Sequence, residues 1–144
     1  MMDLVFCGTP EFAVPVLQRL VTANFQVRLV VTRPDRASGR GLELAVSPIK
    51  RSALELGLPV LQPDKIKNSE EFRAELEHLA PDAIIVVGYG RIIPQWMIDL
   101  PPLGNLNLHA SLLPKYRGAA PIQWAILNDE VETGVIHHGH KFLK

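Results

Sequence analysis

The chain has 144 residues, of which 47% are hydrophobic and 21% charged, and its formal net charge is zero. These values predict one compact domain with a buried core. They argue against a protein that binds nucleic acid with a surface that is basic throughout, but they allow a local basic patch. The single cysteine, Cys7, cannot form an internal disulfide, no apolar run reaches about 18 residues, and the N-terminus lacks the pattern of a signal peptide. We therefore expect a cytoplasmic protein without a membrane segment.

The first thirty residues predict a strand, a helix and a second strand. Residues 3–7 form a short apolar run, and residues 26–32 are rich in β-branched side chains. Between them, apolar residues recur at helical spacing, with Thr9 as the expected N-cap and Pro10 at the expected first helical position. Pro15 is an oddity inside that helical pattern. Strand, helix and strand in this order indicate a parallel sheet.

A long loop with an excess of positive charge is expected next, over residues 33–43. Glycines on both sides of Arg40 allow the backbone to approach a ligand closely, and arginines on such a loop suit phosphate contact. A solvated mobile loop is the other interpretation, and the sequence leaves both open. The charged residues from 33 to 51 are Arg33, Arg36, Arg40, Lys50 and Arg51 against Asp35 and Glu43.

The rest of the chain continues the alternation of helices and strands. The sequence first predicts a helix that begins at Ser47 and Pro48 and ends at Gly57, and then a short strand over 58–63. A helix that begins at Asn68 or Ser69 and a strand over 82–87 follow. The last predicted elements are a short helix that begins at Pro94, a strand from about 103 to 109 and a helix over 119–128. The expected fold class is therefore α/β, with an open, mostly parallel, doubly wound (Rossmann-like) sheet flanked by helices.

Two polar residues in the last predicted strand indicate a site. Asn107 and His109 are two residues apart, so on a strand their side chains face the same way, roughly 6–7 Å apart along the chain. They lie at the carboxyl end of that strand, where ligands bind in open α/β sheets. A pair of hydrogen-bonded core residues is the alternative that spacing alone does not exclude.

Several stretches of the sequence point to one family. They are Phe6 to Phe12, Pro34 to Arg36 with Gly39 to Gly41, Gly88 to Gly90, Asn107 to Pro114, and Tyr116 to Gln123. Over most of its length the chain resembles the N-terminal catalytic domain of methionyl-tRNA formyltransferases. The Asn-x-His followed by Ser-Leu-Leu-Pro is similar to folate-dependent formyltransferases in general. The Arg-Gly-Ala-Ala-Pro-Ile run and the Gly-Arg-Gly loop are more particular to the tRNA enzyme.

This resemblance implies a sheet of the formyltransferase type and transfer of a formyl group from 10-formyltetrahydrofolate to the amine of methionyl-initiator tRNA. Asn107 would donate a hydrogen bond to the developing oxyanion, which is typically worth about 10²–10³ in rate. His109 would stabilise the same oxygen and move protons, a contribution of roughly 10²–10⁴. No metal is expected, and the protein is expected to be a monomer.

The resemblance also implies where the substrates bind. Arg36 and Arg40 would contact the acceptor end of the tRNA, whereas the folate co-substrate would lie along two segments. Those segments consist of Ser111, Leu112, Leu113 and Pro114, and of Tyr89, Gly90, Arg91 and Ile92.

The C-terminal part departs from the family pattern. Residues 1–135 are expected to form an incomplete formyltransferase domain and residues 136–144 a tail that does not match it, with the family's C-terminal tRNA-binding barrel absent. The carboxylate that orients the histidine in the family would fall just beyond Lys144. We therefore expect this 144-residue chain to have activity reduced by orders of magnitude. The three histidines of the tail lack the further ligands of a structural metal site.

Other functions compete with this one. The chain could be a truncated remnant without catalytic activity that at most binds folate or a partner, or a formyltransferase for a different amine, such as a nucleotide or sugar nucleotide. A nicotinamide-binding domain is disfavoured, because Gly8-Thr9-Pro10 is not followed by the glycine-rich fingerprint.

Overall fold

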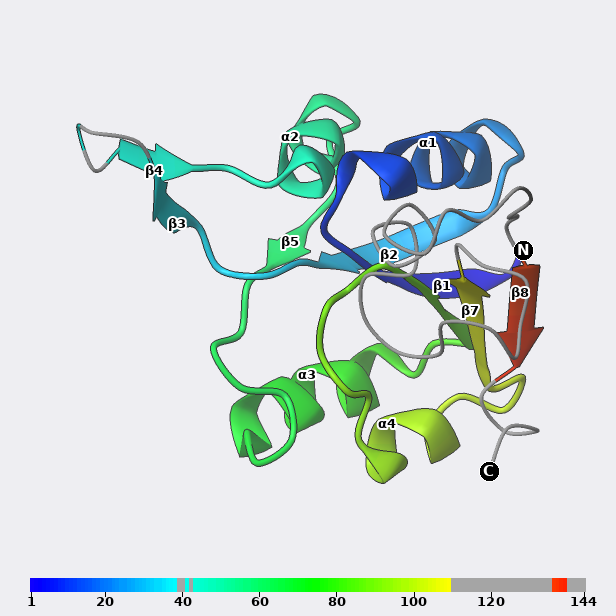
Figure 1. Ribbon diagram of the computed structural model, residues 1–144. Helices are drawn as coiled ribbons and strands as arrows, with labels where there is room; N and C mark the ends of the chain where they lie inside the picture. The colour runs from blue at the N-terminus through cyan, green and yellow to red at the C-terminus, as the bar shows by residue number, and fades with distance from the viewer. Residues whose placement is uncertain (39–40, 42, 110–135, 140–144) are drawn as a thin grey trace, which may run out of the picture.

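A computed structural model describes residues 1–38, 41, 43–109 and 136–139 (Figure 1). A six-stranded sheet runs through the middle of the molecule in the order β5-β2-β1-β6-β7-β8. Its neighbouring strands pair in parallel except β7 and β8, which are antiparallel, and this confirms the predicted open, mostly parallel sheet. The strands are β1 (Asp3–Gly8), β2 (Gln26–Val31), β5 (Val60–Leu61), β6 (Ala83–Val87), β7 (Asn105–His109) and β8 (Ile136–Gly139).

Helices cover both faces of this sheet. The pair α1 (Val14–Thr22) and α2 (Pro48–Glu55) lies on one face, whereas α3 (Glu70–Leu79) and α4 (Gln95–Asp99) lie on the other (Figure 1). The chain thus winds from β1 to β2 and β5 in one direction, then returns past β1 to form β6 and β7. This is the doubly wound topology that the order of elements predicted.

Two apolar layers hold the helices to the sheet, and the alternation of side chains along β1 shows how. Phe6 packs with the first layer, together with Leu17 of α1. Its neighbour Cys7 packs with the second layer, together with Leu76 of α3. Each fully buried aliphatic or aromatic side chain of this kind stabilises the fold by roughly 1.5–3 kcal/mol relative to exposure. Strand β6 is buried on both faces, as its continuous apolar run predicted.

Helix starts were predicted correctly where a serine precedes the helix. The Ser47 hydroxyl accepts a hydrogen bond from the Lys50 amide at 3.0 Å, and Pro48 opens α2. Of the two candidates for α3, Ser69 is the N-cap, and its hydroxyl accepts from the Phe72 amide at 3.2 Å. In both helices the side chain satisfies an amide that has no partner within the helix.

The predicted start of the first helix was wrong. Pro10, not Thr9, is the N-cap of a short 3₁₀ turn over Glu11–Ala13, and α1 begins only at Val14. The oddity at Pro15 is thereby explained, because it lies in the first turn of α1, where the missing amide costs nothing. Thr9 makes a different contact, described below.

The expectation of an irregular loop over residues 33–43 was also wrong. Strands β3 (Arg36–Ser38) and β4 (Glu43–Ala45) form an antiparallel hairpin that projects from one end of the sheet (Figure 1). The polar composition of this segment concealed the strands, since a hairpin outside the core needs no alternation of apolar residues. The predicted helix over 119–128 lies outside the described residues.

Among the described residues, no helix is both long enough and apolar enough to cross a bilayer.

Candidate active site

The strand order reverses between β1 and β6, and the loops that follow these two strands are joined there. The Thr9 hydroxyl donates a hydrogen bond to the carbonyl of Tyr89 at 3.1 Å, which links residues 80 positions apart in the chain. Gly8 and Val87, the last residues of the two strands, are register partners. The crevice outside the carboxyl ends of strands at such a reversal is where open α/β sheets bind ligands.

Glycines allow these loops to lie close together. A Cβ atom at Gly8 would be 2.8 Å from the carbonyl oxygen of Val87, and one at Gly88 would be 2.8 Å from Cγ of Pro10. Gly88 and Gly90 also have positive φ angles of 61° and 86°. A larger residue is therefore unfavourable at Gly8 and Gly88 because its Cβ would clash, and at Gly88 and Gly90 because of the positive φ angle.

Residues 89–92, expected to contact folate, face in different directions. The Tyr89 side chain is buried in the layer beneath α3 and α4, so that in this segment it is the Tyr89 backbone that lies next to Thr9. Burial, with the nearby Cys7, raises the pKa of Tyr89 to about 12, while Arg91 and Arg33 oppose the shift. Ile92, by contrast, is 93% exposed, and its neighbour Arg91 donates from Nη1 to the carbonyl of Pro63 at 2.7 Å.

The Cys7 thiol, near this loop, is not reactive. Cys7 is fully buried, and burial raises its pKa far above the ordinary value. Since the thiolate is the nucleophilic form, Cys7 is not suited to covalent catalysis.

A hydrogen-bonded cluster of Asp35, Lys50 and Gln62, called the Asp35 clamp below, holds the chain just before the β3–β4 hairpin, which we call the hairpin root. The Asp35 carboxylate accepts from Lys50 Nζ at 2.7 Å and from Gln62 Nε2 at 2.8 Å, and the same Gln62 amide donates to the carbonyl of Arg33 at 3.1 Å. Hydrogen bonds from Lys50 and Gln62, and the charge of Lys50, hold the pKa of Asp35 below its usual range. Sequence reasoning counted Asp35 and Lys50 only as loop charges, and the pairing depends on β5 bringing Gln62 beside β2.

Arg33 is a residue that sequence reasoning missed as part of the site. It lies two residues after the end of β2, and a Cβ on Gly90 would be 3.3 Å from both Cδ and Nη1 of Arg33. Burial lowers the pKa of Arg33 below its ordinary value, and the charges of Arg36 and Arg91 act in the same direction. The available signal was a charged residue just after a buried strand, at the same sheet edge as Asn107.

The two predicted catalytic positions lie in β7, next to β6. Asn107 is half-buried and is the register partner of Val86, whereas His109 ends the strand opposite Ile136 of β8. Positions two apart on a strand share a face of the sheet. Arg36 is exposed in β3, whereas Arg40 and the predicted folate segment Ser111, Leu112, Leu113 and Pro114 lie outside the described residues.

An additional asparagine secures the other end of this strand. Asn105 is buried, and its Nδ2 donates to the carbonyls of Met97 at 3.1 Å and Ile98 at 3.3 Å in α4. Strand β7 is therefore tied to α4 at its start, and positions 107 and 109 lie towards its carboxyl end.

The fold is similar to that of solved formyltransferases. Phosphoribosylglycinamide formyltransferase from Bacillus halodurans superposes with a TM-score of 0.71, at 22% identity, over 95% of this chain and 70% of that protein. Glycinamide ribonucleotide transformylase 1 from Geobacillus kaustophilus gives a TM-score of 0.71 at 25% identity over 96% of this chain and 74% of that protein.

Sequence comparison then gives the family. The profile described as "Formyl transferase" matches residues 2–140, so the chain belongs to the formyl transferase family. It is 74% identical over 134 residues to the methionyl-tRNA formyltransferase of Koribacter versatilis and 68% identical over 133 residues to that of Acidobacterium capsulatum. These alignments cover 93% and 92% of this chain but 43% of each relative. The chain thus spans less than half the length of the curated relatives that it matches.

Proposed function

We propose that this chain carries the formyl-transfer site of a methionyl-tRNA formyltransferase, which moves a formyl group from 10-formyltetrahydrofolate to the amine of methionyl-initiator tRNA. The observation that carries the proposal is the placement of Asn107 and His109 at the carboxyl end of β7, beside the reversal of strand order. The names of the two relatives given above support the choice of substrates.

The chemistry needs few groups, and this edge of the sheet provides them. When the amine attacks the formyl carbon, negative charge develops on the formyl oxygen, and the Asn107 amide donates a hydrogen bond to it. His109 takes up the proton that the amine must lose and passes it to N10 of the folate as the bond from N10 to the formyl carbon breaks, so that tetrahydrofolate leaves. No metal is required for these steps. Within the described part of the chain, no three His, Cys, Asp or Glu side chains are grouped to hold one.

The two substrates approach from adjacent loops. The folate lies against the backbone of Tyr89, Gly90, Arg91 and Ile92 and along residues 111–114, while the acceptor end of the tRNA lies against the hairpin that carries Arg36 and Arg40. The projection of the hairpin from this end of the sheet supports that division (Figure 1). We place the protein in the cytoplasm, as a monomer.

The proposal is tested by separating binding from transfer. Titration calorimetry of the 144-residue chain with a non-reactive analogue of 10-formyltetrahydrofolate should show one site. A single-turnover assay with excess protein should then formylate methionyl-initiator tRNA and leave free methionine and amino sugars unchanged. Binding without any transfer would support a protein that only binds folate, and transfer to a small amine would contradict the proposed acceptor.

A further inference from the structure

Arg33 lies against the turn that the proposed folate site uses. Its Cδ and Nη1 are so near Gly90 that a Cβ on that glycine would come within 3.3 Å of both. Its Nε is buried and has no hydrogen-bond partner in the described part of the chain. A buried guanidinium N–H without an acceptor is costly, so this donor requires an acceptor that the described residues do not supply.

Among the described residues, no carboxylate forms an ion pair with Arg33. Asp35 is the nearest carboxylate in sequence, but its two oxygens are already bonded to Lys50 and Gln62, at 2.7 and 2.8 Å. Arg36 and Arg91 both act electrostatically on Arg33, and both have the same sign of charge. Like charges held together destabilise the arrangement unless an anion binds among them.

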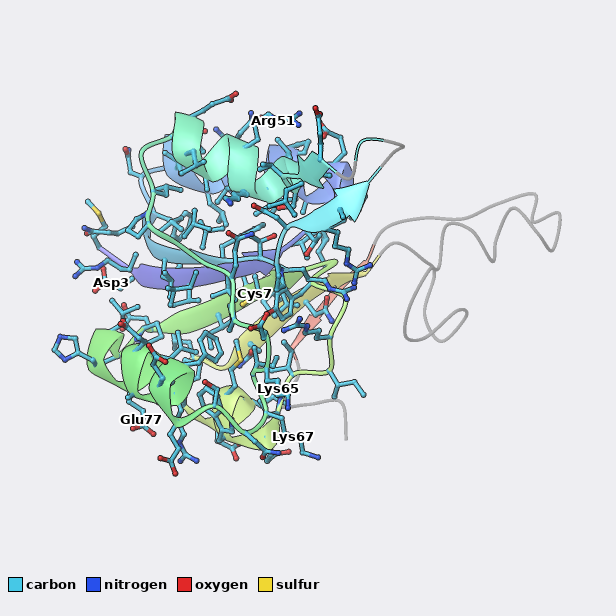
Figure 2. The ribbon with its side chains drawn as sticks, turned by 90° about the vertical axis from the view of Figure 1, so that its left-hand side faces the viewer. Asp3, Cys7, Arg51, Lys65, Lys67 and Glu77 are labelled. Carbon is cyan, nitrogen blue, oxygen red and sulfur yellow. The ribbon has the colours of Figure 1, made fainter. Side chains whose placement is uncertain are left out.

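A neighbouring loop carries two further cations and one acid, the exposed Asp64. Lys65 and Lys67 are exposed on the loop that supplies the Pro63 carbonyl to Arg91, and Figure 2 shows both on the same side of the molecule as α3 and α4. Cations therefore come from the loops after β2, β5 and β6, all at the carboxyl edge of the sheet.

We propose that Arg33 is the centre of a phosphate-binding subsite, flanked by Arg36 and Arg91, that holds a phosphodiester close to the reacting end of the RNA. The planar guanidinium presents paired N–H donors that match the oxygens of a phosphate. Because Arg33 adjoins Gly90, this phosphate lies at the base of the hairpin, beside the turn that the proposed folate site uses. The identity of the ligand rests on the proposed function, whereas the binding of a phosphate does not.

The test uses cytidylyl-(3′→5′)-adenosine, which has one phosphodiester, with inorganic phosphate as a second probe and adenosine as the phosphate-free control. Arg33→Gln should weaken dinucleotide binding by about tenfold or more, as expected for the loss of a charge-assisted bidentate contact. Arg33→Lys should recover part of that loss. Arg28→Gln removes the same charge from an exposed position early in β2 and should change the affinity less than about twofold.

Folding is checked separately, by thermal unfolding at constant ionic strength. Phosphate should raise the melting temperature of the unmodified chain and of Arg28→Gln but not that of Arg33→Gln, because a ligand stabilises only the form that binds it. Equal stabilisation of all three proteins would contradict the subsite.

A third arm distinguishes this proposal from the proposed function. The folate analogue, which carries carboxylates and no phosphate, should bind Arg33→Gln and the unmodified chain alike. If the substitution weakens folate binding and leaves the dinucleotide unaffected, the subsite takes a carboxylate and the proposal is wrong. If it weakens neither, Arg33 is paired within the protein and the proposal is wrong while the proposed function stands. If the unmodified chain binds no folate analogue, the proposed function fails whatever Arg33 does.

Discussion

The two ends of the parallel strands are built on different principles. At the amino end, polar groups pair with one another. The Asp3 amide donates to the Asp82 carboxylate at 2.8 Å, and the Asp82 amide donates to the Asp3 carbonyl at 2.8 Å. At the carboxyl end, Gly88 holds a tight turn, and the buried Nε of Arg33 and hydroxyl of Tyr89 have no partner among the described residues. Figure 2 shows Asp3 at one end of the sheet and the β3–β4 hairpin extending from the other.

The two ends differ in the kind of group that has no partner among the described residues: a guanidinium N–H at the carboxyl end, and a neutral amide oxygen, that of Asn105, at the amino end. At the amino end, the hydrogen bonds between Asp3 and Asp82 contribute to stability, although Asn24, Ala80 and Gly104 have positive φ angles there. The buried Oδ1 of Asn105 also has no partner among the described residues. Positive φ angles and buried polar atoms without partners reduce stability at either end, and they persist because the surrounding sheet is rigid. Substitutions at the two ends should therefore have different consequences.

The largest effect is expected for Asn107→Ala at the carboxyl end of β7. Loss of the amide donor should slow single-turnover formyl transfer by about 10²–10³. The matched control is Asn105→Ala at the start of the same strand, which removes the hydrogen bonds to Met97 and Ile98 and should reduce stability by about 1–3 kcal/mol without a comparable loss of rate. Equal rates for Asn107→Ala and the unmodified chain would contradict the assigned role.

A large loss of stability is expected for Gly88→Ala. The alanine must adopt a φ of 61° and also push its Cβ against Pro10, 2.8 Å away, so the free energy of unfolding should fall by about 2–4 kcal/mol. Gly57→Ala separates the two causes, since its φ is 71° but no atom lies within 4 Å, and it should cost only about 1 kcal/mol. Urea unfolding of both variants measures the difference, and equal losses would show that the contact with Pro10 is relieved without cost.

A smaller, pH-dependent effect is expected at the hairpin root. Because the pKa of Asp35 is lowered by its bonds to Lys50 and Gln62, the ionised carboxylate stabilises the clamp throughout the neutral range. That contribution is lost only as the pH falls through the lowered pKa, below the ordinary value of 3.8. Amide exchange across β3 and β4 should therefore be faster in Asp35→Asn than in the unmodified chain at pH 6. The two proteins should converge in acid, and a constant difference down to pH 3 would contradict the assignment.

The smallest effect is expected for Tyr89→Phe. Among the described residues the buried phenol hydroxyl makes no hydrogen bond of ordinary geometry, although the Arg91 guanidinium lies close enough to lower its pKa. Its removal should therefore change the free energy of unfolding by less than about 1 kcal/mol. Chemical denaturation measures this value. A loss well above 1 kcal/mol would mean that the hydroxyl is bonded to a group outside the described residues.

Sequence reasoning was most successful where a local signal and the tertiary packing agree. The continuous apolar run of β6 predicted burial on both faces, and the serine caps of α2 and α3 were found because each acts within its own first turn. It failed at Thr9, whose hydroxyl bonds to the Tyr89 carbonyl 80 residues away instead of capping a helix. It also failed at the β3–β4 hairpin, where no apolar pattern marks the strands.

The candidate site divides in the same way. Asn107 and His109 could be named because their spacing within one strand is a local property, and the assignment of their roles stays a prediction. Arg33 and the Asp35 clamp could not be named, because each depends on partners supplied by other strands and loops.

By itself, the sequence determined the order of the five parallel strands and of the helices between them, the apolar faces and the family motifs, since these depend on neighbours a few residues apart. Only the tertiary structure decided which loops meet at the carboxyl edge, which carboxylate is already paired, and which cation is left without an acceptor. The physical reason is that hydrogen bonds and charges act over a few ångströms in space. The distance along the chain between two groups does not reveal that separation until the sheet has brought them together.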